Sequence, residues 1–199
     1  TLIKIQRLTA ETSTYWDGIS DWKTAETWIT TSPTWGYSTM PGWAHNTKYA
    51  ISAKSNDAIG NQEGEFAVGT DSFTVLFDRF AATAAITVPT DAGYLNDTQD
   101  VISGTALDAP ADILSLQIAI SSSSTGALSS WWNGTDFASA FSDSVYDSTD
   151  SYTDNTGATP DDWDWNRPAD GKMESTKQYK LRVRTRDRAI PYQERTQDF

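Results

Sequence analysis

The sequence has no cysteine and a single histidine, His45. Without cysteine the chain cannot form a disulfide, a thiolate nucleophile, an iron–sulfur cluster or the usual structural zinc site. With one histidine, most zinc catalysis is excluded and acid–base chemistry is left to carboxylates. No basic-then-apolar leader opens the chain, and no segment approaches the roughly 20 apolar residues of a membrane span. We therefore expect no membrane insertion by this segment.

Basic residues are also few, with 15 Lys and Arg against 27 Asp and Glu, for a net charge of −12. Such a chain repels the phosphate backbone, which argues against nucleic acid as a partner. The balance fits an exported protein that attracts cations. The chain begins at Thr1, directly in strand-like sequence, which indicates a processed form or an excised part of a longer protein.

Large apolar side chains are plentiful by contrast. The chain of 199 residues is 38% hydrophobic and 12% aromatic, with nine Trp, eight Tyr and seven Phe. This composition excludes a wholly disordered acidic chain and suffices for a packed core. The length allows one large domain or two of about 100 residues.

The apolar residues recur with the period of β-strands. Residues 114–121 alternate apolar and polar side chains, which predicts a half-buried antiparallel strand with Leu114, Leu116, Ile118 and Ile120 on its inner face. Residues 179–186 alternate in the same way and put four bases on the wet face. Shorter runs of this kind are separated by Gly, Pro, Asn and Asp clusters. We predict an all-β protein built of antiparallel sandwiches.

Two copies of one domain are present in the sequence. Tyr15-Trp16-Asp17-Gly18 and Trp131-Trp132-Asn133-Gly134 share an aromatic-Trp-Asx-Gly pattern, and residues 49–63 match residues 179–194 with one insertion. We assign residues 1–80 to a unit that lacks its first two strands. Residues 81–199 form a second unit that lacks its last strand and carries a Ser/Asp/Thr-rich inserted loop near 138–160.

These motifs, with Ile86-Thr-x-Pro-x-x-x-Gly-Tyr-Leu95 and Ile102-Ser-Gly-Thr-Ala-x-Asp108, resemble the tandem bacterial immunoglobulin-like repeats of large exported cell-surface proteins. The resemblance implies immunoglobulin-like sandwiches and an extracellular or cell-surface location in a bacterium or archaeon. It also implies a structural role in a surface-layer lattice, a filament or an adhesin stalk. The partners would then be neighbouring copies or adjacent repeats of the same protein, or cell-surface glycans.

Several carboxylates are candidate calcium ligands, because calcium prefers hard oxygen donors. One group is the acidic segment of Asp161, Asp162 and Asp164, read as a loop. The repeated Asp57 and Asp187 each precede a glutamate, Glu63 and Glu194, and Asp108 closes the opening motif of the second unit. The alternative is that each Asp accepts hydrogen bonds from the backbone of its own turn.

Tryptophans offer a second kind of site. Trp16, Trp131 and Trp132 could form a platform for sugar rings, as in an accessory carbohydrate-binding module of a secreted polysaccharide-degrading enzyme. The alternative is core packing, because Asp-Gly and Asn-Gly after a Trp are typical of hairpins that close a sandwich. Asn96 and Asn133 match the glycosylation acceptor pattern.

Catalysis has little support. Paired carboxylates can hydrolyse glycosides, but the repeated motifs fall at core and turn positions, and no pattern supplies a base for a Ser or Thr nucleophile. His45 has no second histidine and is interpreted as a loop residue. We predict no enzyme activity, and no cofactor other than calcium.

Overall fold

A computed structural model describes residues 1–10, 12–32, 36–64, 68–90, 93–94, 101–123, 130–153, 159–166, 168, 172–174 and 177–199. The chain divides into two compact units, Thr1–Arg79 and Phe80–Phe199. The protein is all-β, and its strands pair antiparallel. No helix within the described ranges is long and apolar enough to cross a membrane.

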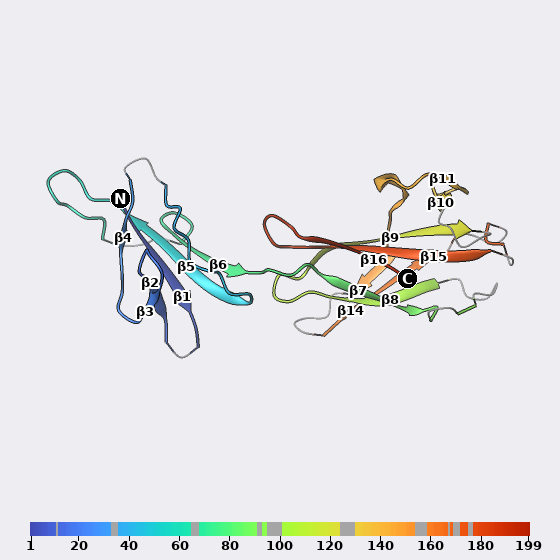
Figure 1. Cartoon of the computed structure of the whole chain (residues 1–199), viewed down its shortest axis with the longest axis horizontal. Coiled ribbons are helices and arrows are strands. Elements are labelled where there is room, and N and C mark those ends of the chain that lie inside the picture. The colour runs from blue at the N-terminus through green and yellow to red at the C-terminus, as the bar shows by residue number, and fades with distance from the viewer. Residues whose placement is uncertain are drawn as a thin grey trace. The chain divides into compact units, whose positions relative to one another are not determined.

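The first unit contains one antiparallel sheet (Figure 1). Its strands are β1 (Leu2–Leu8), β2 (Thr14–Trp16), β3 (Trp22–Lys23), β4 (Ile29–Thr30), β5 (Thr47–Lys54) and β6 (Ser72–Phe77). The sheet order is β3-β2-β1-β5-β6, and β4 pairs with β1. No second sheet faces it among the described residues of this unit.

One face of this sheet carries the core of the first unit. Ile3, Ile5 and Trp16 are buried there, and side chains from the segment that precedes β5 pack onto the same cluster. The ring of Trp43 meets Tyr49 edge-on at 4.6 Å between centroids, and Tyr49 is fully buried. An irregular segment thus covers part of the face that a second sheet would cover in a sandwich.

The second unit is a two-layer sandwich (Figure 1). One layer has the order β11-β10-β9-β15-β16, with β12 paired to β9, and the other has the order β13-β14-β8-β7. The strands are β7 (Thr83–Val88), β8 (Val101–Leu107), β9 (Ile113–Ser123), β10 (Ser130–Trp132), β11 (Phe137–Ser139), β12 (Asp147–Ser148), β13 (Ser151–Thr153), β14 (Asp161–Asn166), β15 (Gln178–Asp187) and β16 (Glu194–Asp198).

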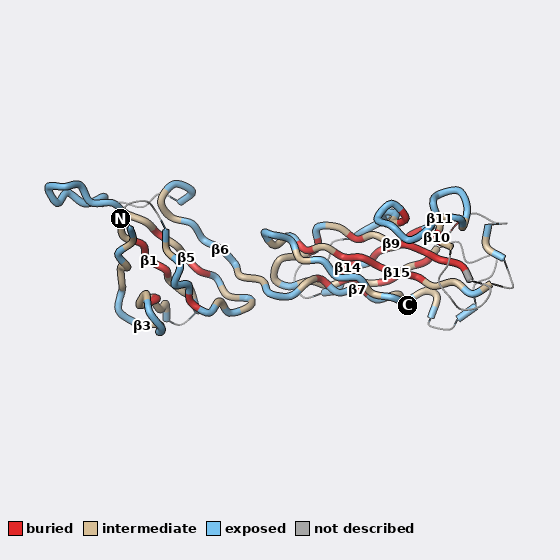
Figure 2. The backbone as a smooth tube through the Cα atoms, turned by 45° about the horizontal axis from the view of Figure 1, so that its top comes forward, coloured by how far each residue is buried: buried red, intermediate tan, exposed pale blue. Residues whose placement is uncertain are grey.

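Apolar side chains of both layers meet in the core of the second unit. Figure 2 shows buried positions along β9, β14 and β15. Trp163 and Ile102 come from one layer, and Ile118 and Val183 from the other. Trp163 packs where β8 has Gly104, because a Cβ at this position would lie 2.4 Å from the indole ring.

The predicted inner set of β9 is correct at three positions and wrong at the first. Leu116, Ile118 and Ile120 are buried, but Leu114 is 53% exposed and Ile113 is buried in its place. The register between β9 and β15 shifts here, since Arg186 pairs with Ser115 and Asp187 with Ile113. The extra residue of a bulge turns the side chains around it to the opposite face.

Two further predictions for the second unit need correction. The described part of the predicted inserted loop near 138–160 contains the 3₁₀ turn η1 (Asp143–Val145) together with β12 and β13, and Val145 is buried against Trp131. The last strand is present as β16, which pairs with residues 182–186 of β15. β16 is displaced along its partner relative to β6, because β6 pairs with residues 47–52 of β5, which match residues 177–182, so the first residues of β15 pair only with β9.

Candidate metal centre

The second unit buries a carboxylate at the end of β15. Asp187 is fully buried, and its Oδ1 accepts hydrogen bonds from the backbone N–H of Ala189 (3.1 Å) and of Gln193 (2.7 Å). Its Oδ2 is also buried and accepts no hydrogen bond from the described residues. A bound cation would stabilise a buried carboxylate oxygen of this kind, because desolvation of an uncompensated charge is costly.

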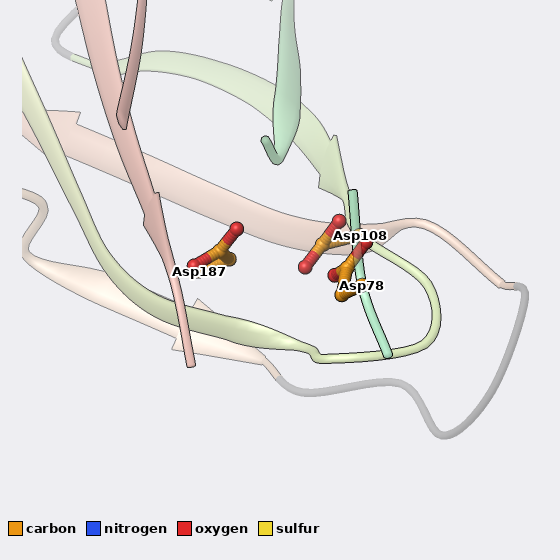
Figure 3. A group of neighbouring side chains, drawn as sticks. All are labelled: Asp78, Asp108 and Asp187. Atoms are coloured by element: carbon orange, nitrogen blue, oxygen red, sulfur yellow. The ribbon is translucent and has the colours of Figure 1, made fainter. Parts of the chain in front are cut away.

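A second carboxylate of the same unit lies beside it. Asp108 directly follows β8, and one of its oxygens lies within 4.8 Å of an oxygen of Asp187. Figure 3 draws both side chains. Two carboxylates at this separation repel one another unless a positive charge is shared between them. Oxygen donors from strand ends and loops suit calcium, which accepts flexible geometry.

The repeated aspartate of the first unit has both oxygens engaged by its own turn. Asp57 Oδ1 accepts from the N–H of Ile59 (3.0 Å) and of Asn61 (2.8 Å), and Oδ2 accepts from Asn61 Nδ2 (2.6 Å). These bonds, the backbone one from Asn61 foremost, lower the pKa of this exposed carboxyl. Asn61 and Gln193 occupy equivalent positions in the two turns, because the backbone carbonyl of each accepts a hydrogen bond from the N–H of the aspartate, Asp57 or Asp187.

The two glutamates of the repeat serve neighbouring groups. Glu63 accepts a hydrogen bond from the N–H of Ser55 (3.2 Å), whereas Glu194 accepts one from Arg186 Nε (2.6 Å). Neither belongs to the carboxylate group that contains Asp187. The repeated residues therefore form the same kind of turn in both units, and they do not converge as a set of metal ligands.

The acidic segment 161–164 is a strand, and the expectation of a loop is wrong. In β14, Asp161 points into the sandwich with Trp163, while Asp162 is exposed and Asp164 is intermediate. Asp161 accepts a hydrogen bond from the Tyr152 hydroxyl, and Asp164 accepts one from Ser151. Alternation in a strand sends neighbouring side chains to opposite faces, so these three carboxylates do not converge.

The three tryptophans of the sugar hypothesis differ in exposure. Trp16 and Trp131 are only 5% and 3% exposed, and Trp16 Nε1 donates to the Tyr37 hydroxyl (2.9 Å). Buried rings of this kind have no open face for a sugar. Trp132 is half-buried, packs on Phe137 and lines a shallow groove with Thr135, Asp147, Trp165, Asn166 and Lys172.

Asn133 forms the turn between β10 and β11. Its Oδ1 accepts from the N–H groups of Thr135 and Asp136 (both 2.9 Å), and its Nδ2 donates to Asp136 Oδ1 (2.8 Å). Gly134 has a φ of 91°, which favours glycine. The Asn-Gly pair thus fulfils the hairpin prediction. Asn96, the other predicted glycosylation site, lies outside the described residues.

The groove beside Trp132 and the ion pairs on the outer face of β15 were not singled out from the sequence. Arg184 is only 6% exposed and donates to Gln117 Oε1 (2.8 Å) and Asp143 Oδ1 (2.8 Å). The alternation of β15 signalled a basic face, but no local pattern signalled Asp143 as its partner. His45, expected in a loop, has its Nδ1 3.1 Å from Asp78 Oδ1 within the first unit.

Comparison of the chain with protein-family models, with curated proteins and with solved structures finds no match.

Proposed function

We propose that this chain is a structural repeat segment of a large exported cell-surface protein, in which repeated β-sheet units set the reach of a lattice, filament or adhesin stalk. The observation that carries the proposal is the repetition of one sheet. The strand order β3-β2-β1-β5-β6 of the first unit, with β4 paired to β1, matches the order β11-β10-β9-β15-β16 of the second, with β12 paired to β9. A sheet repeated along the chain suits a spacer, because the reach of such a chain grows with the number of repeated units.

The strand order of the second unit supports an immunoglobulin-like assignment. The layers β7-β8-β14-β13 and β9-β15-β16 correspond to the A-B-E-D and C-F-G sheets of that fold. The terminal strands of this unit are also tied to one another, because the N–H of Ala84 in β7 donates to Gln197 Oε1 in β16 (2.8 Å). A pulling force applied at the two ends of this unit would act on β7 and β16, which are the first and last strands of its two layers.

Single-molecule force spectroscopy tests the spacer role on the full chain. We expect the second unit to unfold in one cooperative step that lengthens the chain by about 3.3–3.6 Å per residue released. A second unit that extends gradually without a force peak would contradict a load-bearing role.

The same proposal assigns calcium to the pair Asp108 and Asp187. The support is the buried Oδ2 of Asp187, which accepts no hydrogen bond within the described part of the chain, together with the second carboxylate nearby. Isothermal titration with calcium should give binding to the wild-type chain that Asp187→Asn and Asp108→Asn both abolish. At a calcium concentration 100 times the Kd, the folded state gains about 2.7 kcal/mol of stability.

Asp57→Asn is the matched control for the calcium test. Asp57 occupies the equivalent turn, but both its oxygens accept hydrogen bonds from the turn. This variant should keep the calcium response of the wild type. A melting temperature of the wild-type chain that is unchanged by millimolar calcium would refute the metal site and leave the turn role for both aspartates.

A carbohydrate-binding module is the second candidate function. The groove beside Trp132 favours it, since a half-exposed indole with Thr135, Asn166 and Lys172 offers a stacking face and hydrogen-bonding groups. Retention of the wild-type chain on a panel of cell-wall and plant polysaccharides, lost in Lys172→Ala with an unchanged melting curve, would favour the module over the spacer. No retention on any of them would favour the spacer.

A further inference from the structure

β6 is the outermost strand of the first unit's sheet, and its sequence lacks the residues that usually prevent an edge strand from pairing with another chain. The sheet order ends at β6, and its six residues, Ser-Phe-Thr-Val-Leu-Phe, include no charge, no proline and no glycine. Phe73, Val75 and Leu76 are 51%, 42% and 41% exposed. An apolar edge strand of this kind is a template for another strand, unless charge, proline or a bulge blocks it.

The direction of the hydrogen bonds defines which part of β6 is open. The N–H of Ala53 in β5 donates to the carbonyl of Asp71 (2.8 Å), so odd-numbered residues direct their backbone groups toward β5. Thr74 and Leu76 therefore direct their N–H and C=O outward. The carbonyl of Ser72 already accepts from the N–H of Gly69 (2.8 Å). Among the described residues, the stretch of β6 whose outward backbone groups pair with no other strand is therefore 73–77.

β16, the strand at the same edge of the second unit's sheet, carries charged side chains that oppose such pairing. β16 pairs with β15 as β6 pairs with β5, and its five residues include Glu194, Arg195 and Asp198. Glu194 and Asp198 form ion pairs with Arg186 and Arg182 of β15. Adding a strand beside β16 would require desolvation of these charges, whereas adding one beside β6 requires no such step.

We propose that β6 pairs antiparallel with β6 of a second copy of this chain, about a two-fold axis at Val75. In this register Thr74 lies opposite Leu76 of the second copy, and the two residues exchange both hydrogen bonds. Val75 then faces Val75 of the second copy and Phe73 faces Phe77 of the second copy, all on one side of the joined sheet. An axis at Thr74 would instead need the Ser72 carbonyl that Gly69 occupies.

A second copy fits this edge because the strand is complementary to itself. The two-fold pairing uses the open groups of both copies at once and places aromatic side chains across from aromatic side chains, a favourable cross-strand pair. Each copy carries a net charge of −12, which opposes association at long range. Added salt screens this repulsion, so the dimer should tighten as ionic strength rises. This inference does not depend on the proposed function.

Sedimentation velocity of the full chain from micromolar to millimolar concentration tests the pairing. We expect a monomer–dimer equilibrium that salt strengthens. Val75→Lys places like charges across the axis, and Thr74→Pro removes an outward N–H without removing a bond to β5. Each should weaken the dimer by at least about tenfold, while Ala85→Lys on the exposed edge strand β7 should not.

Because the chain has no cysteine, a crosslink gives a second readout that does not depend on a disruptive substitution. Opposed residues of a non-hydrogen-bonded pair have Cα atoms about 4.5 Å apart, within the range of a disulfide. Val75→Cys should therefore oxidise to a covalent dimer, and Ala85→Cys should not. A monomer at millimolar concentration in high salt would overturn the proposal. A dimer that Val75→Lys and Thr74→Pro leave intact would also overturn it.

Discussion

Replacing Trp131 with alanine tests whether the aromatic-Trp-Asx-Gly motif serves packing. Trp131 is 3% exposed and packs with Ala119 and Val145, its ring centroid lies 4.8 Å from that of Phe141, and the Arg182 guanidinium stacks over it at 5.2 Å. Truncation of a buried Trp costs about 3–5 kcal/mol. For a unit of this size the melting temperature falls by about 4 °C per kcal/mol, so we expect a loss of about 12–20 °C.

Scanning calorimetry of the full chain measures this loss, and Trp131→Phe is the control. Phenylalanine keeps a ring in the same place, so less than half of the loss is expected. Trp16→Ala should destabilise the first unit in the same way, because Trp16 is buried and hydrogen-bonded to Tyr37. An unchanged melting curve for Trp131→Ala, combined with lost retention on a polysaccharide matrix, would refute the packing role.

Three further changes probe other features of the fold. Gly104→Ala would bring a Cβ within 2.0 Å of a β7 carbonyl oxygen. We expect the free energy of unfolding, measured by guanidinium titration, to fall by about 1–3 kcal/mol or more. An unchanged midpoint would disprove the close contact. Three backbone N–H groups hold the pKa of Asp17 at about 2, below its ordinary 3.8. The stabilisation that the ionised Asp17 carboxylate gives to the folded state is therefore complete above about pH 4 and is lost as pH falls through 2. Asp17→Asn should flatten the pH dependence of Tm in this interval, and an NMR titration of Asp17 at its ordinary pKa would contradict the assignment. Arg184→Met removes the bonds to Gln117 and Asp143, so hydrogen exchange in η1 should quicken, and unaltered exchange would show that the tether is unimportant.

The sequence alone was enough for the secondary structure and for much of the core. Period-two alternation identified β9 and β15, because a strand with one buried face has to repeat every second residue. The alternation also put Ile118 and Val183 on inner faces, where both are buried. Gly and Asx residues marked the turns, because few other residues adopt the conformations that turns require.

Only the tertiary structure decided which carboxylates meet. Asp57 and Asp187 look equivalent in sequence, yet Asp57 is exposed with both oxygens bonded, whereas Asp187 is buried and its Oδ2 has no partner among the described residues. Asp187 lies at a register shift between β15 and β9 and close to Asp108, a residue distant in sequence. Likewise residues 161–164 were read as an acidic loop from their composition, but they lie in β14, where Asp161 is buried because a second layer covers that face. Local sequence sets backbone conformation through short-range sterics and hydrogen bonds, but proximity between distant residues depends on how the sheets stack.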